Sequence, residues 1–215
     1  MKLILARHGE TSWNTEFRLQ GQEDSPLTPR GEQQSAALAE RFREIAVDVL
    51  YASDLGRARQ TARFVERILG IEARVEPLLR ERHLGIFQGL TRREAAERFP
   101  IEYGRYARNE PGFGIPDGES VTERQERCAT FLREVVARHG TEKATVAAVT
   151  HGEMLEGVFR HLGKHSLETP LEALSTTFLL PNCGWNECEW TGAEWEIRSW
   201  GDIAHLASLS VLNAI

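Results

Sequence analysis

Short apolar runs alternate along the chain with longer segments in which apolar residues recur at helical spacing. The apolar runs predict buried strands over residues 2–6, 47–52, 73–76 and 145–150. The segments of helical spacing predict helices over residues 29–45, 54–69, 121–139 and 151–162. Strands that alternate with helices in this way indicate an α/β fold, which we expect to be a three-layer α/β/α sandwich on a mostly parallel sheet.

Capping residues mark where several helices begin. Thr28 followed by Pro29 is typical of an N-cap and the first helical position. We expect Ser53 to cap the next helix along the chain. Thr91 and Ser120 are each followed three residues later by Glu, which is the pattern of a capping box. These positions predict the helix starts independently of the apolar spacing.

The middle and the end of the chain show weaker patterns. Residues 100–116 are rich in Gly, Pro and aromatic residues and have no clear periodicity. We therefore expect residues 82–120 to form a small lid insertion over the main layers, within a single domain that spans residues 1–215. Near the C-terminus, antiparallel strands are predicted over residues 175–180, 185–190 and 195–199.

The composition narrows the class of protein. Of the 215 residues, 41% are apolar and 27% are charged, as in an ordinary soluble globular domain. The net charge of −6 argues against a general nucleic-acid binder, so an anionic substrate has to be held by a local positive cluster. No apolar run exceeds four residues, whereas a membrane-spanning helix needs about 18. The three cysteines suggest no disulfide framework, and we expect a cytoplasmic protein.

Two similar segments follow two of the predicted strands. His8 and Gly9 come directly after the first strand, and His151 and Gly152 come after the strand at 145–150. Because ligands bind beyond the carboxyl ends of strands in open α/β sheets, we expect the two histidines to face one crevice. The glycines would let the backbone approach a ligand closely. Either histidine alone is better explained as a partly buried residue with satisfied hydrogen bonds, but the repeated pattern, with Arg7 next to the first histidine, favours a site.

Arg57 lies in the first turns of the helix that follows Ser53. A helix N-terminus favours anions, and a guanidinium adds a planar fork that matches phosphate oxygens. Arg59, two residues further on, is better interpreted as a solvated helix residue. Considered alone, Arg57 is better interpreted as a surface residue that forms an ion pair. Together with the two histidines, it indicates an anion site.

Several short motifs follow one another in a fixed order along the chain. They are LARHGETSWN at 5–14, QG at 20–21, SPLTPRG at 25–31, SDLGRA at 53–58, RERHLGIFQG at 80–89, GES at 118–120, VTHG at 149–152 and GDIAHL at 201–206. In residues and order they resemble the histidine phosphatase superfamily, also called the phosphoglycerate-mutase-like family. The resemblance spans residues 3–206 and is nearest in pattern to the broad-specificity and small-metabolite phosphatases.

The resemblance implies a phosphoryl-transfer site. His8 would be the nucleophile that forms a phosphohistidine, and Glu81 would donate a proton to the leaving alkoxide. Arg7, Arg57 and His151 would surround the non-bridging oxygens and neutralise their charge. Residues that match substrate-contacting positions are Asn14, Gln20, Gly21 and Gly152. The resemblance implies no cofactor and no metal.

Three functions remain open within this resemblance. Cofactor-dependent phosphoglycerate mutases carry a tyrosine shortly after the acid and later an arginine pair, whereas this chain has Leu84 and no adjacent pair in residues 100–116. A non-catalytic phospho-ligand or protein-interaction domain would have lost the nucleophile or the acid, but His8, Glu81 and His151 are all present. We therefore predict hydrolysis of a phosphomonoester.

The sequence also leads to expectations about the partners of the protein and about residues near the predicted site. We expect a small phosphorylated metabolite as the substrate and neither a nucleic acid nor a membrane as a partner, and a homodimer is compatible with the sequence. Glu153 follows the second His-Gly pair, where relatives usually have a small or apolar residue. We interpret it as a salt-bridge partner that alters the entrance of the site. Cys183 and Cys188 lack the spacing of a zinc site.

Overall fold

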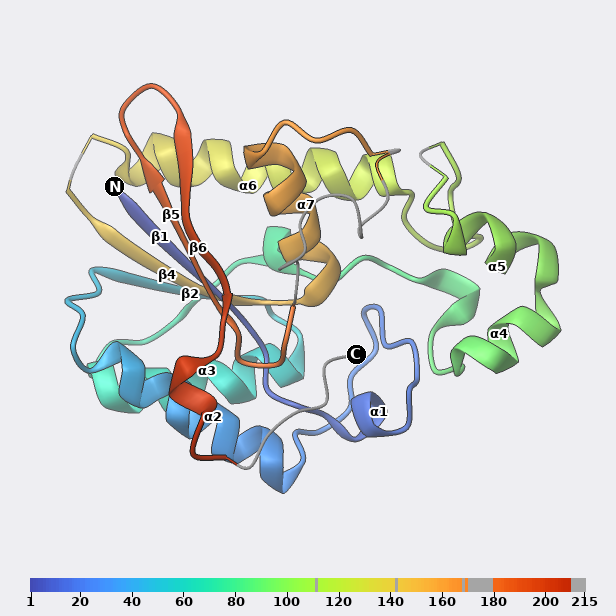
Figure 1. Cartoon of the computed structure of the whole chain (residues 1–215), viewed down its shortest axis with the longest axis horizontal. Helices are drawn as coiled ribbons and strands as arrows, with labels where there is room; N and C mark the ends of the chain where they lie inside the picture. The colour runs from blue at the N-terminus through green and yellow to red at the C-terminus, as the bar shows by residue number, and fades with distance from the viewer. Residues whose placement is uncertain (111, 142, 168, 170–179, 210–215) are drawn as a thin grey trace.

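The described strands form one sheet at the centre of the molecule (Figure 1). The computed structural model describes the chain apart from residues 111, 142, 168, 170–179 and 210–215. The strand order is β3-β2-β4-β1-β5-β6. The bounds are β1 Lys2–Arg7, β2 Val49–Ala52, β3 Arg74–Val75, β4 Thr145–Thr150, β5 Trp185–Trp190 and β6 Trp195–Asp202. The strands β3, β2, β4 and β1 are mutually parallel, and β5 and β6 form an antiparallel hairpin beside β1.

Helices cover both faces of the sheet, with α2 and α3 on one side and α6 and α7 on the other (Figure 1). The helix bounds are α1 Ser12–Thr15, α2 Pro29–Phe42, α3 Gly56–Leu69, α4 Arg92–Arg98, α5 Pro100–Ala107, α6 Val121–His139 and α7 Gly152–Leu162. Short 3-10 turns are η1 Pro77–Leu79, η2 Gly85–Phe87 and η3 Ala204–Leu206. The predicted strand at 175–180 lies outside the described residues, except for Leu180.

The apolar run of β1 explains why two helical layers are needed. Ile4 and Ala6 belong to a buried core on the side of α2 and α3. Leu3 and Leu5 belong to a second core on the side of α6 and α7. Successive side chains of a strand point to opposite faces, so a strand that is apolar throughout must be covered on both. The predicted α/β/α sandwich on a mostly parallel sheet is confirmed, and the predicted antiparallel strands near the C-terminus form the hairpin of β5 and β6 at its edge.

The segment between β3 and α6 builds a small core of its own. Leu84, Phe87, Ala95, Phe113 and Ile115 are buried together there. Both predicted capping boxes form, at the start of α4 and of α6. The first half of the stretch over 100–116, which has no clear periodicity in the sequence, forms α5, which begins at a proline and packs aromatic side chains against this core. The helices α4 and α5 project beyond one end of the sheet (Figure 1).

Candidate active site

The two strand-end histidines lie side by side. The strands β1 and β4 are parallel neighbours, and Arg7 pairs in register with Thr150. The residues that follow, His8 and His151, therefore leave the sheet at the same edge. Their ring centroids are 5.2 Å apart, and both side chains are buried. The structure thus brings together the two histidines that the repeated strand–His–Gly pattern singled out.

The hydrogen bonds of His8 define its tautomer. Its Nδ1 lies 2.8 Å from the carbonyl oxygen of Gly9, so Nδ1 carries the proton and donates it. Its Nε2 accepts a hydrogen bond from Nε of Arg57 at 3.3 Å and therefore holds a lone pair. Burial lowers the pKa of His8 well below its usual value, and the positive charges of Arg57 and Arg7 lower it further. The ring is consequently neutral, with a lone pair on the nitrogen that faces Arg57.

His151 and Arg7 present buried polar atoms that no other described residue satisfies. Neither ring nitrogen of His151 has a hydrogen-bond partner among the described residues, and the same holds for Nε of Arg7. The Nη1 atom of Arg7 donates to the carbonyl oxygen of Leu180 at 2.6 Å. Burial lowers the pKa of His151 well below its usual value, with Arg57 as the next cause. Buried groups without partners are costly, and a bound anion would accept hydrogen bonds from Nε of Arg7 and from the protonated ring nitrogen of His151.

Arg57 is held in place by a residue that sequence reasoning missed. The predicted cap, Ser53, does not cap α3, whose N-cap residue is Leu55 without a side-chain hydrogen bond. Instead, the carboxylate of Asp24 accepts the backbone N–H groups of Gly56 at 2.6 Å and of Arg57 at 3.3 Å. The same carboxylate pairs with Nη1 of Arg57 at 3.0 Å. The prediction fails because the cap comes from a loop more than 30 residues away.

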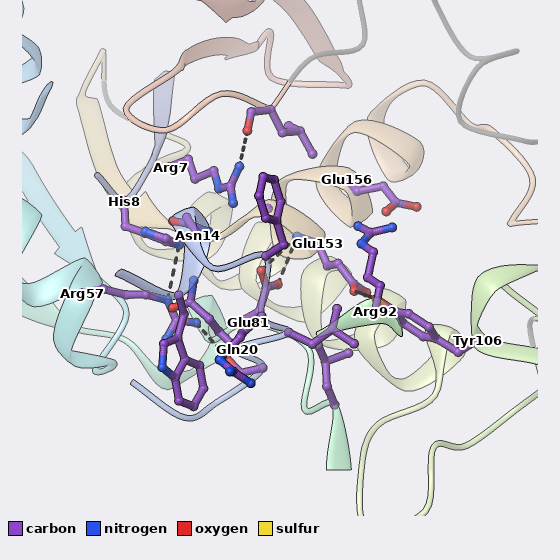
Figure 2. Close-up of a pocket in the computed structure, with 18 residues that line it drawn as sticks. Arg7, His8, Asn14, Gln20, Arg57, Glu81, Arg92, Tyr106, Glu153 and Glu156 are labelled. Carbon is purple, nitrogen blue, oxygen red and sulfur yellow. Dashed lines mark hydrogen bonds between the residues drawn. The ribbon is translucent and has the colours of Figure 1, made fainter. Parts of the chain in front are cut away.

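A pocket of about 280 Å³ opens over these side chains (Figure 2). The predicted site residues that line it are Arg7, His8, Asn14, Gln20, Gly21, Arg57, Glu81 and Gly152. His151 is fully buried and does not line the pocket, but its ring centroid lies 5.2 Å from that of His8. The structure therefore places all of the sequence-predicted site residues in or against one pocket.

Three of the predicted substrate-contacting residues also hold the pocket wall together. Gln20 donates from Nε2 to the hydroxyl of Thr11 at 2.8 Å. Asn14 accepts the backbone N–H of Thr11 at 3.1 Å and closes a capping box at the start of α1. The carbonyl oxygen of Gly21 accepts Nη2 of Arg57 at 2.7 Å, and Gly21 has a positive φ of 55°. The wall is thus ordered before any ligand enters.

The two glycines after the histidines serve different purposes. A Cβ on Gly152 would lie 3.7 Å from both Cζ of Arg7 and Oε2 of Glu81, inside the pocket. A Cβ on Gly9 would instead lie 2.5 Å from the carbonyl oxygen of Gly31 in α2. The expectation of close ligand approach fits Gly152 but is wrong for Gly9, where close packing of a helix excludes a side chain.

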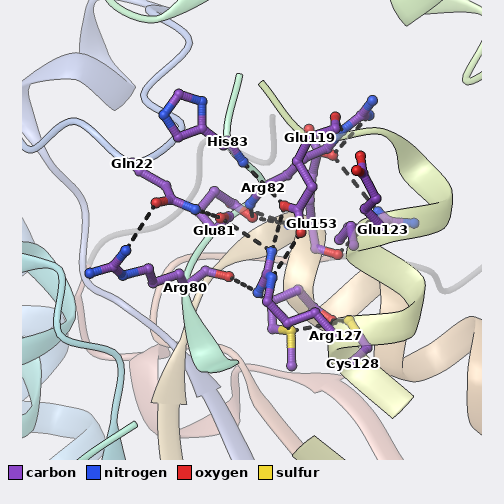
Figure 3. Close-up of polar contacts among 12 residues, drawn as sticks. Gln22, Arg80, Glu81, Arg82, His83, Glu119, Glu123, Arg127, Cys128 and Glu153 are labelled. Atoms are coloured by element: carbon purple, nitrogen blue, oxygen red, sulfur yellow. Dashed lines mark hydrogen bonds and ion pairs between the residues drawn. The ribbon is translucent and has the colours of Figure 1, made fainter. Parts of the chain in front are cut away.

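Glu81 enters the pocket from the segment that follows η1. Its carboxylate accepts the backbone N–H groups of Arg82 and of Glu153, each at 3.0 Å. The backbone of this segment is tied to α6, because Arg127 donates to the carbonyl oxygens of Leu78 at 2.9 Å and Arg80 at 2.6 Å (Figure 3). These contacts fix both the position and the orientation of the Glu81 carboxylate.

The side of the pocket beyond Glu81 holds a charged network that sequence reasoning did not foresee. Glu153 pairs with Arg82 at 3.4 Å and with Arg124 at 3.7 Å, as expected of a salt-bridge partner. Glu156 pairs with Arg124 at 3.4 Å and with Arg160 at 2.8 Å. The three arginines are almost completely buried. The i,i+4 spacing of Glu156 and Arg160 on α7 is a local pattern, whereas Arg82 and Arg124 come from other parts of the chain and no local pattern links them to Glu153.

The pocket has two parts. The histidine end comprises Arg7, His8, Arg57 and His151. The glutamate end comprises Glu153 and Glu156 with their arginine partners, and Arg92 and Tyr106 line the pocket beside them. Figure 2 shows Glu81 between the two ends.

Other kinds of site receive little support from the described residues. Within the described ranges, no group of three or more His, Cys, Asp or Glu side chains is arranged to hold a metal ion. No helix in the described part of the chain has the length and apolar character needed to cross a membrane.

Comparison with known proteins identifies the family. The chain matches the histidine phosphatase superfamily, branch 1, over residues 3–203. It belongs to this superfamily. The predicted family is thereby confirmed, and with it the prediction of a phosphomonoester hydrolase. The α/β fold is likewise shared with the solved members of this superfamily.

Individual relatives of this histidine phosphatase carry different names. A metal-independent phosphoserine phosphatase from Arabidopsis thaliana is 35% identical, over 98% of this chain and 85% of that protein. A probable phosphoglycerate mutase, GpmB, from Enterobacter sp. (strain 638) is 36% identical, over 96% of this chain and 95% of that protein. The structure of a mycobacterial glucosyl-3-phosphoglycerate phosphatase with VO3 has a TM-score of 0.81 at 29% identity, covering 94% of this chain and 99% of that one.

Proposed function

We propose that this enzyme hydrolyses small phosphorylated metabolites through a phosphohistidine intermediate on His8. One observation carries the proposal. Nδ1 of His8 is held by the carbonyl of Gly9, and its lone pair on Nε2 faces a guanidinium at the histidine end. A neutral imidazole with an oriented lone pair beside fixed positive charge is what nucleophilic attack on a phosphate ester requires.

The first step forms the intermediate. Nε2 of His8 attacks phosphorus, and the bond between phosphorus and the ester oxygen breaks. The carboxyl group of Glu81 donates its proton to the leaving oxygen, which departs as an alcohol. Arg7, Arg57 and His151 hydrogen-bond to the non-bridging oxygens and offset their charge. The hydrogen bond from Arg57 to Nε2 is released as the phosphoryl group takes its place.

The second step returns the enzyme to its starting state. Water enters the position that the alcohol has left, and the Glu81 carboxylate takes one of its protons as the water oxygen attacks phosphorus. The bond between Nε2 and phosphorus breaks, and inorganic phosphate leaves. Each step uses the same carboxyl group, first as an acid and then as a base, so no further proton carrier is needed.

The size of the pocket supports a small substrate. A volume of about 280 Å³ is near the lower limit for ligand pockets in proteins, which suits a metabolite better than a folded macromolecule. Asn14, Gln20, Gly21 and Gly152 would contact the phosphate or its immediate neighbours. The relatives named for phosphoserine and for glucosyl-3-phosphoglycerate act on phosphorylated compounds of this kind, which supports the same class here.

A phosphoglycerate mutase is the second candidate, because several relatives carry that name. A mutase must return the phosphoryl group from His8 to another hydroxyl before water reaches it. Supplying 3-phosphoglycerate together with 2,3-bisphosphoglycerate distinguishes the two. We expect slow release of phosphate and little isomerisation, and efficient isomerisation would make the enzyme a mutase.

The proposed hydrolysis is tested with p-nitrophenyl phosphate. Wild-type enzyme should release phosphate, and His8→Ala should lose at least about a thousandfold in kcat/KM. His161→Ala, which removes an exposed histidine of α7, is the matched control and should retain activity. Turnover should survive EDTA. Equal rates for wild type and His8→Ala would refute the mechanism, and loss to EDTA that zinc or magnesium restores would refute metal independence.

The proposal also covers the cellular location, the partners and the oligomeric state of the enzyme. We infer a cytoplasmic location, which is supported by three buried cysteine thiols that form no disulfide, Cys128, Cys183 and Cys188. A phosphorylated metabolite remains the expected partner, without a nucleic acid or a membrane. A homodimer stays a prediction, which light scattering of the purified protein would test.

A further inference from the structure

Glu153 occupies a distinctive position beside the proposed proton donor. It is the second residue of α7, and its backbone N–H donates to both carboxylate oxygens of Glu81, at 3.0 and 3.3 Å. Its own side chain lines the pocket. The backbone of Glu153 is therefore fixed beside the group that would protonate the leaving oxygen, and its side chain lies next to Glu81 in the pocket (Figure 2). A substrate group that contacts the Glu153 carboxylate would lie near the ester oxygen.

The Glu153 side chain is anchored from behind. Its Oε2 atom faces Arg82 and Arg124, whose side chains are only 1% and 0% exposed. The Glu153 side chain itself is 23% exposed, although it belongs to the same network. The two arginines therefore hold the carboxylate from the protein interior and do not reach the substrate. Glu153 is the member of this ion-paired group that is exposed to the pocket.

The second carboxylate oxygen, Oε1, is only weakly engaged. Its one hydrogen bond from the described residues comes from the hydroxyl of Tyr106 at 3.3 Å. A carboxylate oxygen has room for a further donor. Burial raises the pKa of Glu153, and the positive charge of Arg82 offsets part of this rise. A donor brought by a substrate would offset part of that cost.

Glu156 provides an internal comparison on the same helix. Its Oε1 accepts Nε of Arg160 at 2.8 Å, and its Oε2 faces Arg124 at 3.4 Å. Its side chain is 8% exposed. Both of its oxygens are thus engaged by buried arginines, whereas Glu153 has an oxygen to offer. The two glutamates share one arginine but differ in what they present to the pocket.

We propose that Glu153 is a specificity-determining residue that selects phosphomonoesters whose leaving alcohol carries a hydrogen-bond donor, above all an ammonium group, next to the ester oxygen. The inference rests on the proposed phosphatase function. A hydrogen bond to a charged acceptor is stronger than a neutral one, and a paired ammonium is stronger still. A leaving group that lacks a donor would bury Oε1 without a partner and would be disfavoured.

The test compares three esters of similar size on the wild-type enzyme. Propyl phosphate, 2-hydroxyethyl phosphate and 2-aminoethyl phosphate differ only in the terminal methyl, hydroxyl or ammonium group. None carries a carboxylate, so Arg92 at the same end of the pocket does not confound the comparison. We expect kcat/KM to rise from the methyl to the hydroxyl to the ammonium ester, by about tenfold or more overall. Dissociation constants of the same esters are measured by calorimetry.

Two substitutions of Glu153 separate its charge from its acceptor oxygen. Glu153→Gln should lose most of the preference for the ammonium ester and keep part of that for the hydroxyl ester. Glu153→Ala should lose both preferences. Glu97→Gln is the control, because Glu97 is an exposed glutamate of α4 that pairs with Arg93 outside the pocket, and it should keep the wild-type ratios. Circular dichroism of each variant verifies the fold.

The outcomes separate this inference from the function on which it rests. Wild-type ratios in both Glu153 variants, or equal losses on all three esters, would show that Glu153 only supports the structure and would overturn the inference. Hydrolysis of p-nitrophenyl phosphate without any preference among the three esters would overturn it as well, while the phosphatase function stands. Failure to hydrolyse any ester would refute the function, and the calorimetric affinities would still decide whether Glu153 selects donors.

Discussion

The two ends of the pocket differ in how far their buried polar and charged groups are paired before a ligand binds. At the histidine end, His151 and Arg7 bury polar atoms that no described residue satisfies. At the glutamate end, each carboxylate is ion-paired with buried arginines before any ligand arrives. Since buried unpaired groups cost free energy, an anion that accepts hydrogen bonds from these groups would stabilise the histidine end. At the glutamate end the charges are paired internally, although Nε and Nη2 of Arg124 also have no hydrogen-bond partner among the described residues.

This difference indicates that the two ends have separate roles in substrate recognition. The histidine end binds what every substrate shares, which is the phosphate. The glutamate end can only distinguish substrates by their leaving groups, because most of its charge is already used internally. Glu81 lies between the two and connects them, since its carboxylate is held by the backbone of Glu153. Substitutions at the histidine end should therefore affect all esters, and those at Glu81 or beyond should depend on the ester.

The largest substrate-dependent effect is expected for Glu81→Gln. Removing the proton donor should lower kcat by about 10²- to 10⁴-fold on an alkyl phosphate, whose alkoxide is a poor leaving group. The loss on p-nitrophenyl phosphate should be far smaller, because p-nitrophenolate leaves without a proton. Steady-state rates on both esters measure the difference. Equal losses on the two would contradict the role of Glu81 as an acid.

Arg57→Ala should weaken the histidine end for every ester alike. Losing one fixed donor to the transferring phosphoryl group costs about 10²- to 10³-fold in kcat/KM. The control is Arg93→Ala, an exposed arginine of α4 that pairs with Glu97 and should leave kcat/KM unchanged. The two variants are compared on the alkyl and the p-nitrophenyl ester. A loss confined to one ester would break the proposed division between the two ends.

Asp24→Asn tests whether the histidine end depends on its remote cap. The carboxylate holds both the guanidinium of Arg57 and the start of α3, and the loss of charged hydrogen bonds should lower kcat/KM by about tenfold. Asp54→Asn is the matched control, since Asp54 pairs instead with Arg80. Inhibition by vanadate should weaken in parallel for Asp24→Asn only. An equal response of both variants would mean that Asp24 has no special connection to the site.

Much of the histidine end could be predicted from the sequence. The repeated strand–His–Gly pattern placed His8 and His151 at two strand ends, and parallel neighbouring strands end at the same edge. What made them neighbours, the pairing of β1 with β4 across more than 140 residues, lies outside any local pattern. The family resemblance supplied the order of the motifs and so the expected roles.

The remaining contacts could not be predicted, for physical reasons. Asp24 reaches α3 from a separate loop. The sequence just before α3 offers only Ser53 as a capping residue, and Ser53 does not cap the helix. The partners of Glu153 come from α6 and from the segment after η1, and an isolated arginine in sequence looks solvated until the fold buries it. Gly9 looked like a ligand-contacting glycine, because the packing of α2 against it is a tertiary contact.

The smallest predicted effect concerns stability rather than catalysis. Burial lowers the pKa of His8 and His151 in the folded enzyme, and lowers that of His205 to about 4. In the unfolded chain a histidine has a pKa of about 6.5, so the unfolded state binds protons at a higher pH than the folded state does. Stability should therefore fall below about pH 6.5, by at most about 1.4 kcal/mol per pH unit for each histidine.

Urea unfolding at a series of pH values between 7.5 and 5.5 measures this dependence. His8→Asn should reduce the slope of unfolding free energy against pH in the acid range, because it removes one of the histidines. Stability that stays constant or rises as the pH falls from 7 to 5.5 would contradict neutral histidines in the folded state.

The most direct test of the mechanism is to trap the intermediate. Enzyme mixed with excess p-nitrophenyl phosphate and quenched in alkali within the first turnover preserves a phosphorus–nitrogen bond, and peptide mass spectrometry locates the phosphoryl group. We predict one phosphoryl group on the peptide that contains His8, formed and lost at rates that match turnover, and none in His8→Asn. A phosphoryl group on another residue, or undiminished turnover in His8→Asn, would contradict the account.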